Sequence, residues 1–239
     1  MEKMMKVFAP DGRIYQMEYA FKAVQQFGQT AVSVRGTDSV VTVTQRKVPD
    51  KLIVPESITN TFNITDCIGA CIVGNMNDAR FVVQWLRSEA AQFKLKNQYE
   101  PTVQIMAQKL GLQLQRFSQY AQMRPFCVVV TLAGVDEEFG PQIYKIDPAG
   151  QSLGYRAIAT GSKDQEAVTQ LEKHWKKNEG QWSATESVMT AIKTLQTVIS
   201  TDFKADEIEV SFASAANPRF RRLTNQEVDA VLNEMHDQA

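Results

Sequence analysis

A serine flanked by glycines is the first feature of the sequence that could support catalysis. Residues 150–154 read G-Q-S-L-G, and in α/β-hydrolases a G-x-S-x-G pattern places the nucleophile, here Ser152, on a tight turn from a strand into a helix. Residues 155–159, which follow, read as a strand instead. The histidines downstream are His174, in a lysine-rich helix end, and His236, near the C-terminus. This context favours a hairpin turn over a catalytic triad, and a stand-alone serine hydrolase is the alternative function.

Three cysteines are the next candidates, as metal ligands. Cys67 and Cys71 lie four positions apart in a strand-like stretch, so at about 3.3 Å per residue their side chains are roughly 13 Å apart and cannot share a tetrahedral zinc. The sequence contains neither a G-x-x-x-x-G-K loop nor a strand-linked G-x-G-x-x-G loop that would hold phosphates. We therefore predict no metal and no cofactor. An odd number of thiols favours a reducing compartment, the cytoplasm or the nucleus.

The charge balance argues against two further classes of partner. The 239 residues include 26 Lys and Arg against 27 Asp and Glu, a formal net charge of -1, so whole-protein charge would not drive binding to nucleic acid or to an anionic membrane. A basic cluster at residues 219–222 is predicted to be a solvated edge or a subunit contact. The longest apolar run, residues 126–135, is about half the length of a transmembrane helix. No secretory signal is visible.

Hydrophobic periodicity and turn residues divide the chain into short elements. They predict one domain over residues 1–239 without a linker, and the capping-box pattern occurs at Ser183 with Glu186 and at Thr224 with Glu227. Runs of strands followed by runs of helices favour an α+β fold, with antiparallel sheets covered by helices in a layered sandwich. Helices are expected at 14–25, from 78, from 101, at 164–177, 185–200 and 225–236. Strands are expected at 30–35, 40–45, 60–65, 68–73, 126–135, 142–147, 155–160 and 207–213.

The N-terminal segment closely resembles a known signature. Residues 8–20 read F-A-P-D-G-R-I-Y-Q-M-E-Y-A, and the N-terminal signature of 20S proteasome alpha subunits is F-S-P-x-G-R-x-x-Q-x-E-Y-A. The resemblance extends through most of the chain, and some segments look like the eukaryotic alpha type-6 subunits, which hold the first position of the alpha ring. Supporting segments of both kinds are residues 48–52, 77–80, 123–125, 134–138, 140–144, 147–150, 171–173, 202–204 and 207–210.

This resemblance implies a fold and a role. The fold would be the four-layer N-terminal-nucleophile hydrolase sandwich, two antiparallel β-sheets flanked by helix layers. The role would be that of a structural, non-catalytic subunit in a seven-membered alpha ring, with the other alpha subunits, the beta subunits of the adjacent ring and docking regulatory particles or activators as partners in ubiquitin-dependent protein degradation. Residues 1–13 would lie near the gate of the entry pore, and residues 14–26 would form a helix on the ring surface.

The positions that match the catalytic residues of beta subunits argue against peptidase activity. Catalysis in those subunits uses an N-terminal threonine whose own amine helps to activate its hydroxyl. The matching residue, Thr30, has 29 residues ahead of it, so its amine is in a peptide bond. The family's catalytic Asp falls near Gln45 and its Lys near Asn60. An active beta-like peptidase, the remaining alternative, would have to be cut before Thr30.

Gate and activator-docking residues carry over only in part. The family's gating residues match Pro10 and Tyr19, and its Tyr-Asp pair falls on Met1 and Glu2, where the carboxylate is kept and the phenol is lost. The activator pocket would include Glu18 and Gly28, with Asn60 at the lysine position. Since charge-assisted hydrogen bonds are roughly twice as strong as neutral ones, we expect a weak or non-carboxylate site there. Cys127 also replaces a family glycine.

Overall fold

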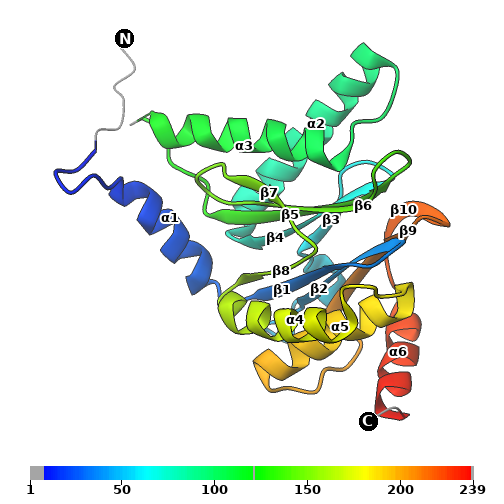
Figure 1. Ribbon diagram of the computed structural model, residues 1–239. Coiled ribbons are helices and arrows are strands. Elements are labelled where there is room, and N and C mark those ends of the chain that lie inside the picture. The colour runs from blue at the N-terminus through cyan, green and yellow to red at the C-terminus, as the bar shows by residue number, and fades with distance from the viewer. Residues whose placement is uncertain (1–7, 121, 238–239) are drawn as a thin grey trace.

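Two five-stranded antiparallel sheets lie face to face in the computed structural model, which describes residues 8–120 and 122–237 (Figure 1). The strand order is β10-β9-β2-β1-β8 in the first sheet and β3-β4-β5-β6-β7 in the second. The strands are β1 Thr30–Arg35, β2 Ser39–Gln45, β3 Thr61–Asn63, β4 Ile68–Gly74, β5 Val128–Asp136, β6 Gly140–Ile146, β7 Ser152–Gly154, β8 Ala157–Gly161, β9 Ile208–Ser214 and β10 Asn217–Arg222.

Helices cover the outer face of each sheet, so the described part of the chain forms four layers (Figure 1). α2 and α3 pack on the second sheet, and α4 and α5 pack on the first. This confirms the predicted sandwich. The helices are α1 Tyr15–Gln26, α2 Met76–Asn97, α3 Val103–Gln119, α4 Asp164–Asn178, α5 Ala184–Ile199 and α6 Asn225–Asp237, and a short 3-10 helix spans Pro55–Ser57.

Alternating side chains serve two separate cores. Val32 and Val34 of β1 point toward α4 and α5, whereas Val40 of β2 faces the second sheet. Between the sheets the Phe220 ring lies directly on Gly69, where an added Cβ would sit 2.0 Å from the ring. Because both faces of each sheet are covered, the central strands β2 and β4 are buried throughout.

Helix starts follow the expected capping chemistry, with one correction. The capping box of Ser183 and Glu186 forms at α5, and Thr224 exchanges the corresponding bonds with Glu227 at α6. The predicted helix start at Pro101 is wrong, because Thr102 is the N-cap and accepts a bond from the Ile105 amide. The proline therefore precedes the cap instead of occupying the first turn.

Edge strands account for the other differences from the prediction. β7 has three residues, and β10 contains Pro218 and three arginines, so neither shows apolar alternation. Proline is tolerated in β10 because this strand lies at the edge of its sheet. The strand expected over residues 60–65 is limited to β3.

The half-buried Cys127 immediately precedes β5 and is held by the start of α2. Its amide donates to Asp78 Oδ2 at 2.9 Å, and Arg124 forms two bonds to the same carboxylate. Burial opposes ionisation of Asp78, but these hydrogen bonds outweigh it and lower the pKa of the carboxyl. The cysteine at the family's glycine position is therefore accommodated without loss of β5.

Candidate functional site

The N-terminal signature builds a turn that leads into α1. Gly12 N donates to Ala9 O at 2.8 Å, with Pro10 at the second position of the turn and Gly12 at φ +78°. Proline presets the backbone there, and glycine accepts positive φ without strain. The Tyr15 hydroxyl donates to Asp11 Oδ2 at 2.7 Å, which raises the pKa of Tyr15. The turn is thus tied to the first turn of the helix.

α1 has a narrow buried stripe and a broad exposed face. Met17, Ala20 and Val24 are buried, which is the spacing of one helical side. Phe21 lies four positions after Met17 but is 39% exposed. Tyr19 is 57% exposed, as its position off the stripe predicts. The helix therefore contacts its own domain through few side chains and presents aromatic side chains outward.

The buried stripe of α1 closes one end of the sandwich. In Figure 1 the helix crosses the gap between the two sheets at the end where β1 begins. Val24 packs in one cluster with Ala31 of the first sheet and with Val73 and Val129 of the second. Thr30, one residue before Ala31, is also buried.

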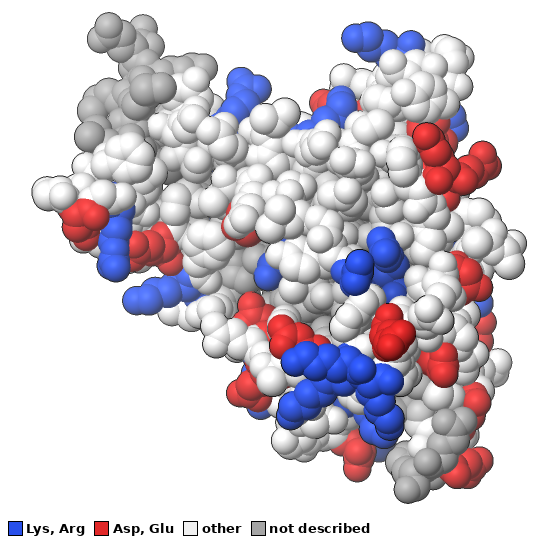
Figure 2. Space-filling view, viewed as in Figure 1, with Lys and Arg blue, Asp and Glu red and all other residues white. Residues whose placement is uncertain are grey.

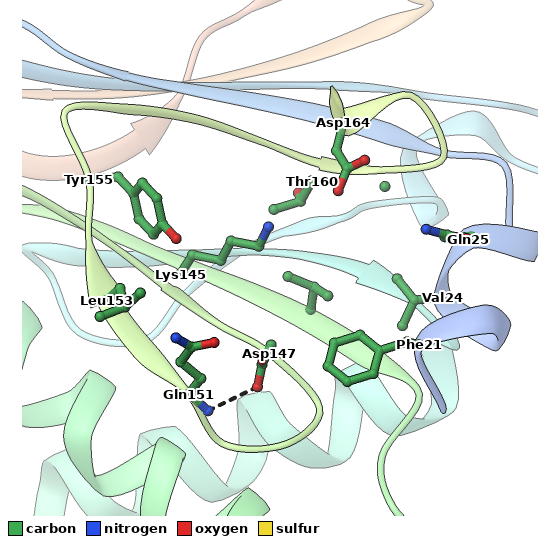
Figure 3. Close-up of a pocket in the computed structure, with 12 residues that line it drawn as sticks. Phe21, Val24, Gln25, Lys145, Asp147, Gln151, Leu153, Tyr155, Thr160 and Asp164 are labelled. Carbon is green, nitrogen blue, oxygen red and sulfur yellow. Dashed lines mark hydrogen bonds between the residues drawn. The ribbon is translucent and has the colours of Figure 1, made fainter. Parts of the chain in front are cut away.

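A cavity of about 180 Å³ lies beside α1, between β6, β7 and β8 (Figure 3). Lys145 extends across it toward Thr160, and Phe21 faces it from α1. Within the described residues the Lys145 ammonium has no hydrogen bond or ion pair. Asp147 is already engaged, since it accepts from the amides of residues 149 and 151. The cavity offers one free cation and hydroxyl groups for a contact, but its lining contains no imidazole or thiol that could serve in covalent catalysis.

The positions matched to catalytic residues meet at this same end of the fold. Asn60 Nδ2 donates to Gln45 O at 3.2 Å, and Thr44 Oγ1 donates to Thr30 O at 3.5 Å. Thr30 Oγ1 lies 3.4 Å from Ser162 Oγ, and no base among the described residues contacts it. The three expected positions are therefore grouped, but amides stand where an acid and a lysine would be needed.

A buried carboxylate that the sequence did not reveal holds this region together. The Glu209 side chain is fully buried, accepts from Arg46 Nε and Nη2 at 3.4 and 3.3 Å, and pairs with Arg222 at 3.5 Å. Its other oxygen accepts from the amide of Asn60 and the hydroxyls of residues 59 and 61. The one indication of this network in the sequence is an acidic residue at an interior position of the strand expected at 207–213. Its partners come from separate segments of both sheets, and the network therefore crosslinks them.

Other candidates for chemistry do not assemble. Ser152 begins β7, which leads to β8 and not to a helix, so the strand-to-helix turn of a hydrolase nucleophile is missing. Its Oγ is buried and has no partner among the described residues. Cys71 is a free thiol whose burial raises its pKa. The described residues contain no group of three potential metal ligands and no helix long and apolar enough to span a membrane.

Comparison with known proteins identifies the family. Residues 26–213 match the proteasome subunit family, and residues 6–23 match the N-terminal signature of A-type proteasome subunits. The chain belongs to the proteasome alpha subunit family. It is 41% identical over 231 residues to a probable alpha type-1 proteasome subunit of Schizosaccharomyces pombe, covering 97% of this chain and 94% of the relative. It is 36% identical over 234 residues to the alpha type-6 proteasome subunit of Caenorhabditis elegans (98% and 95%), and 32% identical over 234 residues to a proteasome alpha subunit of Pyrococcus horikoshii (98% and 87%).

The alpha-subunit positions expected to act in gating and docking are distributed unevenly. Glu2 lies outside the described residues, and Pro10 and Tyr19 are both exposed. Glu18, which lies 3.6 Å from Arg13, and Gly28 stand at opposite ends of α1, about 15 Å apart at 1.5 Å per residue. One copy of the chain therefore does not bring them together.

Asn60 is the expected pocket residue that the structure corrects. Its side chain is 0% exposed, so it does not face a surface pocket. The cation beside Gly28 is Lys47, whose Nζ donates to Gly28 O at 2.6 Å. The family's lysine position falls on Asn60, which precedes β3, whereas Lys47 follows β2. The family pattern therefore did not point to Lys47. Among the predicted pocket residues of this chain, Glu18 and Gly28 thus remain accessible.

Proposed function

We propose that this chain is a non-catalytic structural subunit of the alpha ring of the 20S proteasome. The observation that carries the proposal is the state of Thr30, which is buried at the first position of β1 with its nitrogen in a peptide bond. A threonine nucleophile needs a free amine or another base within hydrogen-bond reach and a path for substrate. Thr30 has neither of these among the described residues.

The exposed face of α1 supports a role in ring assembly. Tyr15 and Tyr19 are 44% and 57% exposed, and Phe27 at the end of the helix is also exposed. Aromatic side chains are enriched in protein–protein interfaces, where they remove large apolar areas from water. We infer that neighbouring alpha subunits cover this face and that beta subunits pack on the ring. Resemblance to the alpha type-6 subunits favours the first ring position.

Gating and activator docking complete the proposal. The turn at Pro10, tied to α1 through Tyr15, would lie near the entry pore. The Tyr19 hydroxyl, which has no hydrogen bond among the described residues, could bind the tail of a neighbouring subunit. Glu18 and Gly28 would each contribute to a different pocket between subunits, with Lys47 in place of Asn60 as the nearby cation. The cytoplasm and the nucleus remain the predicted location.

Assembly tests this function directly. Tagged chain should be recovered by native mass spectrometry in a four-tiered particle with one copy in each outer ring. Tyr19→Asp should reduce incorporation because it places a charge on the interface face, whereas the matched variant Tyr19→Phe should assemble normally. In assembled particles Tyr19→Phe should lower activator-stimulated peptide entry if its hydroxyl holds the gate.

Three results would overturn the proposal. A stable monomer that does not enter particles would exclude the ring role. Peptidase or esterase activity of the pure chain that is lost in Thr30→Ala or in Ser152→Ala would show catalysis, and an intact mass corresponding to a cut before Thr30 would identify a beta-like peptidase.

A further inference from the structure

A second cavity lies at the opposite end of β1 from α1 and the predicted nucleophile position. It has a volume of about 280 Å³ and is bounded by the ends of β1 and α4 and by the turn between β5 and β6. Its lining is Arg35, Gly36, Thr37, Phe139, Pro141, Arg156, Trp175 and Gly180, with no acidic residue. Figure 2 shows Lys and Arg side chains gathered on the face of the molecule that carries α4 and α5.

Two arginines face each other across neighbouring strands in this cavity. Arg35 N donates to Arg156 O at 2.8 Å, which continues the β1–β8 ladder by one residue beyond the pair of Val34 with Ala157. Cβ atoms at such positions are about 5 Å apart, and like charges placed there destabilise a sheet. Among the described residues neither guanidinium forms a hydrogen bond or an ion pair. The pair therefore lacks the counter-charge that would make it favourable.

An aromatic wall holds one of these arginines in place. Arg156 Cζ lies 4.8 Å from the centre of the Trp175 ring, and Trp175 packs edge-on against the fully buried Trp182. Gly180 allows this arrangement, since a Cβ there would lie 1.8 Å from the Trp175 ring. A stacked guanidinium keeps its N–H groups directed outward for a carboxylate. Phe139 adds an exposed apolar surface beside it.

We propose that this cavity, the Arg35–Arg156 site, binds an acidic segment of a partner protein. A carboxylate placed between the guanidiniums would receive paired N–H bonds from arginine and remove the repulsion between them. The volume is below that of a typical small-molecule pocket and suits one or two side chains. Phe139 and Trp175 would contact an apolar residue next to the carboxylate. Nucleic acid fits poorly, because the chain is nearly neutral.

Fluorescence anisotropy with the purified full chain tests this site. The probe is a fluorescein-labelled peptide of sequence GELELG, compared with the uncharged isostere GQLQLG. We expect Arg35→Gln and Arg156→Gln each to weaken binding of GELELG by roughly two- to fivefold, as for a partly exposed ion pair. The matched control is Arg219→Gln, because Arg219 is exposed on β10, outside the cavity.

Each outcome decides for or against the site. Binding of GELELG but not GQLQLG, with loss in the two cavity variants and none in the control, supports it. Equal binding of both peptides, equal loss in Arg219→Gln, or no binding at about 1 mM peptide overturns it. Inorganic phosphate that competes as well as GELELG would show a small-anion site instead. Removing one of two like charges should leave the melting temperature unchanged or raised, so that misfolding is detected separately.

Discussion

Replacing Glu209 by glutamine should destabilise the fold far more than any exposed acid would. The substitution keeps the shape but removes the charge that pairs with Arg46, whose side chain is 7% exposed. One Glu209 oxygen accepts hydrogen bonds from arginines, and the other accepts them from residues 59–61. In Glu209→Gln an NH2 group replaces one of these oxygens, so its N–H groups would point at other hydrogen-bond donors. Leaving a buried charge unpaired costs about 3–5 kcal/mol, and Arg222, 36% exposed, can turn to solvent and adds little.

Urea unfolding followed by circular dichroism measures this effect. Glu209→Gln should lower the free energy of unfolding by about 3–5 kcal/mol, whereas the control Asp206→Asn, an exposed acid nearby, should change it by less than about 0.5 kcal/mol. In an Arg46→Met background the cost of Glu209→Gln should fall by about 1 kcal/mol or more, because the buried cation is gone. Equal costs in both backgrounds, or a change in Glu209→Gln no larger than in Asp206→Asn, would refute the assignment of a buried ionic crosslink.

Three smaller perturbations follow from local contacts. Ser183→Ala removes the N-cap of α5 and should cost about 1 kcal/mol in the same unfolding assay; no change would contradict the cap. A hydrogen bond from Arg221 lowers the pKa of Glu227 to about 2, so this group's contribution to stability is complete above its unfolded pKa of about 4.3 and is lost as the pH falls toward 2. The free energy of unfolding of Glu227→Gln should therefore fall less steeply with decreasing pH over that range than that of the unchanged protein. Identical slopes for the two proteins would exclude a contribution from the Arg221–Glu227 pair. Burial of Cys71 raises the pKa of its thiol, so Cys71 should resist a thiol-labelling reagent applied to the folded protein. The half-buried Cys127 should be modified under the same conditions, and peptide mass mapping distinguishes the two sites.

The sequence predicted secondary structure best for strands that are buried on both faces and for helices. β4 and β5 are covered on both faces, so their apolar stretches are long enough to recognise. β10 is an edge strand whose exposed positions carry arginines, and its identity depends on pairing with β9. A strand that is defined mainly by its partner leaves little local pattern to read.

For the candidate catalytic site, the sequence predicted which positions of the chain belong to it but not how their side chains are placed. Resemblance to the family matched Thr30, Gln45 and Asn60 to catalytic positions, and the structure groups them at one end of the sandwich. The same resemblance placed Asn60 in an activator pocket, whereas the structure buries it. The reason is that Glu209 draws the segment before β3 inward through its bond with the Asn60 amide. Contacts between residues about 150 positions apart leave no periodic signal in a single sequence.

Several linked features of this chain oppose catalysis at Thr30, so restoring one residue should not restore activity. In Asn60→Lys the ammonium would enter a site with 0% exposure, beside a Glu209 that already binds two arginines. The cost of removing this ammonium from water would be offset only if the new lysine displaced Arg46 from Glu209. We therefore expect lower stability and no peptide hydrolysis. Thr30 would still lack a free amine and would still be buried. Measurable hydrolysis by Asn60→Lys, abolished by Thr30→Ala, would show instead that the missing lysine alone keeps this chain inactive.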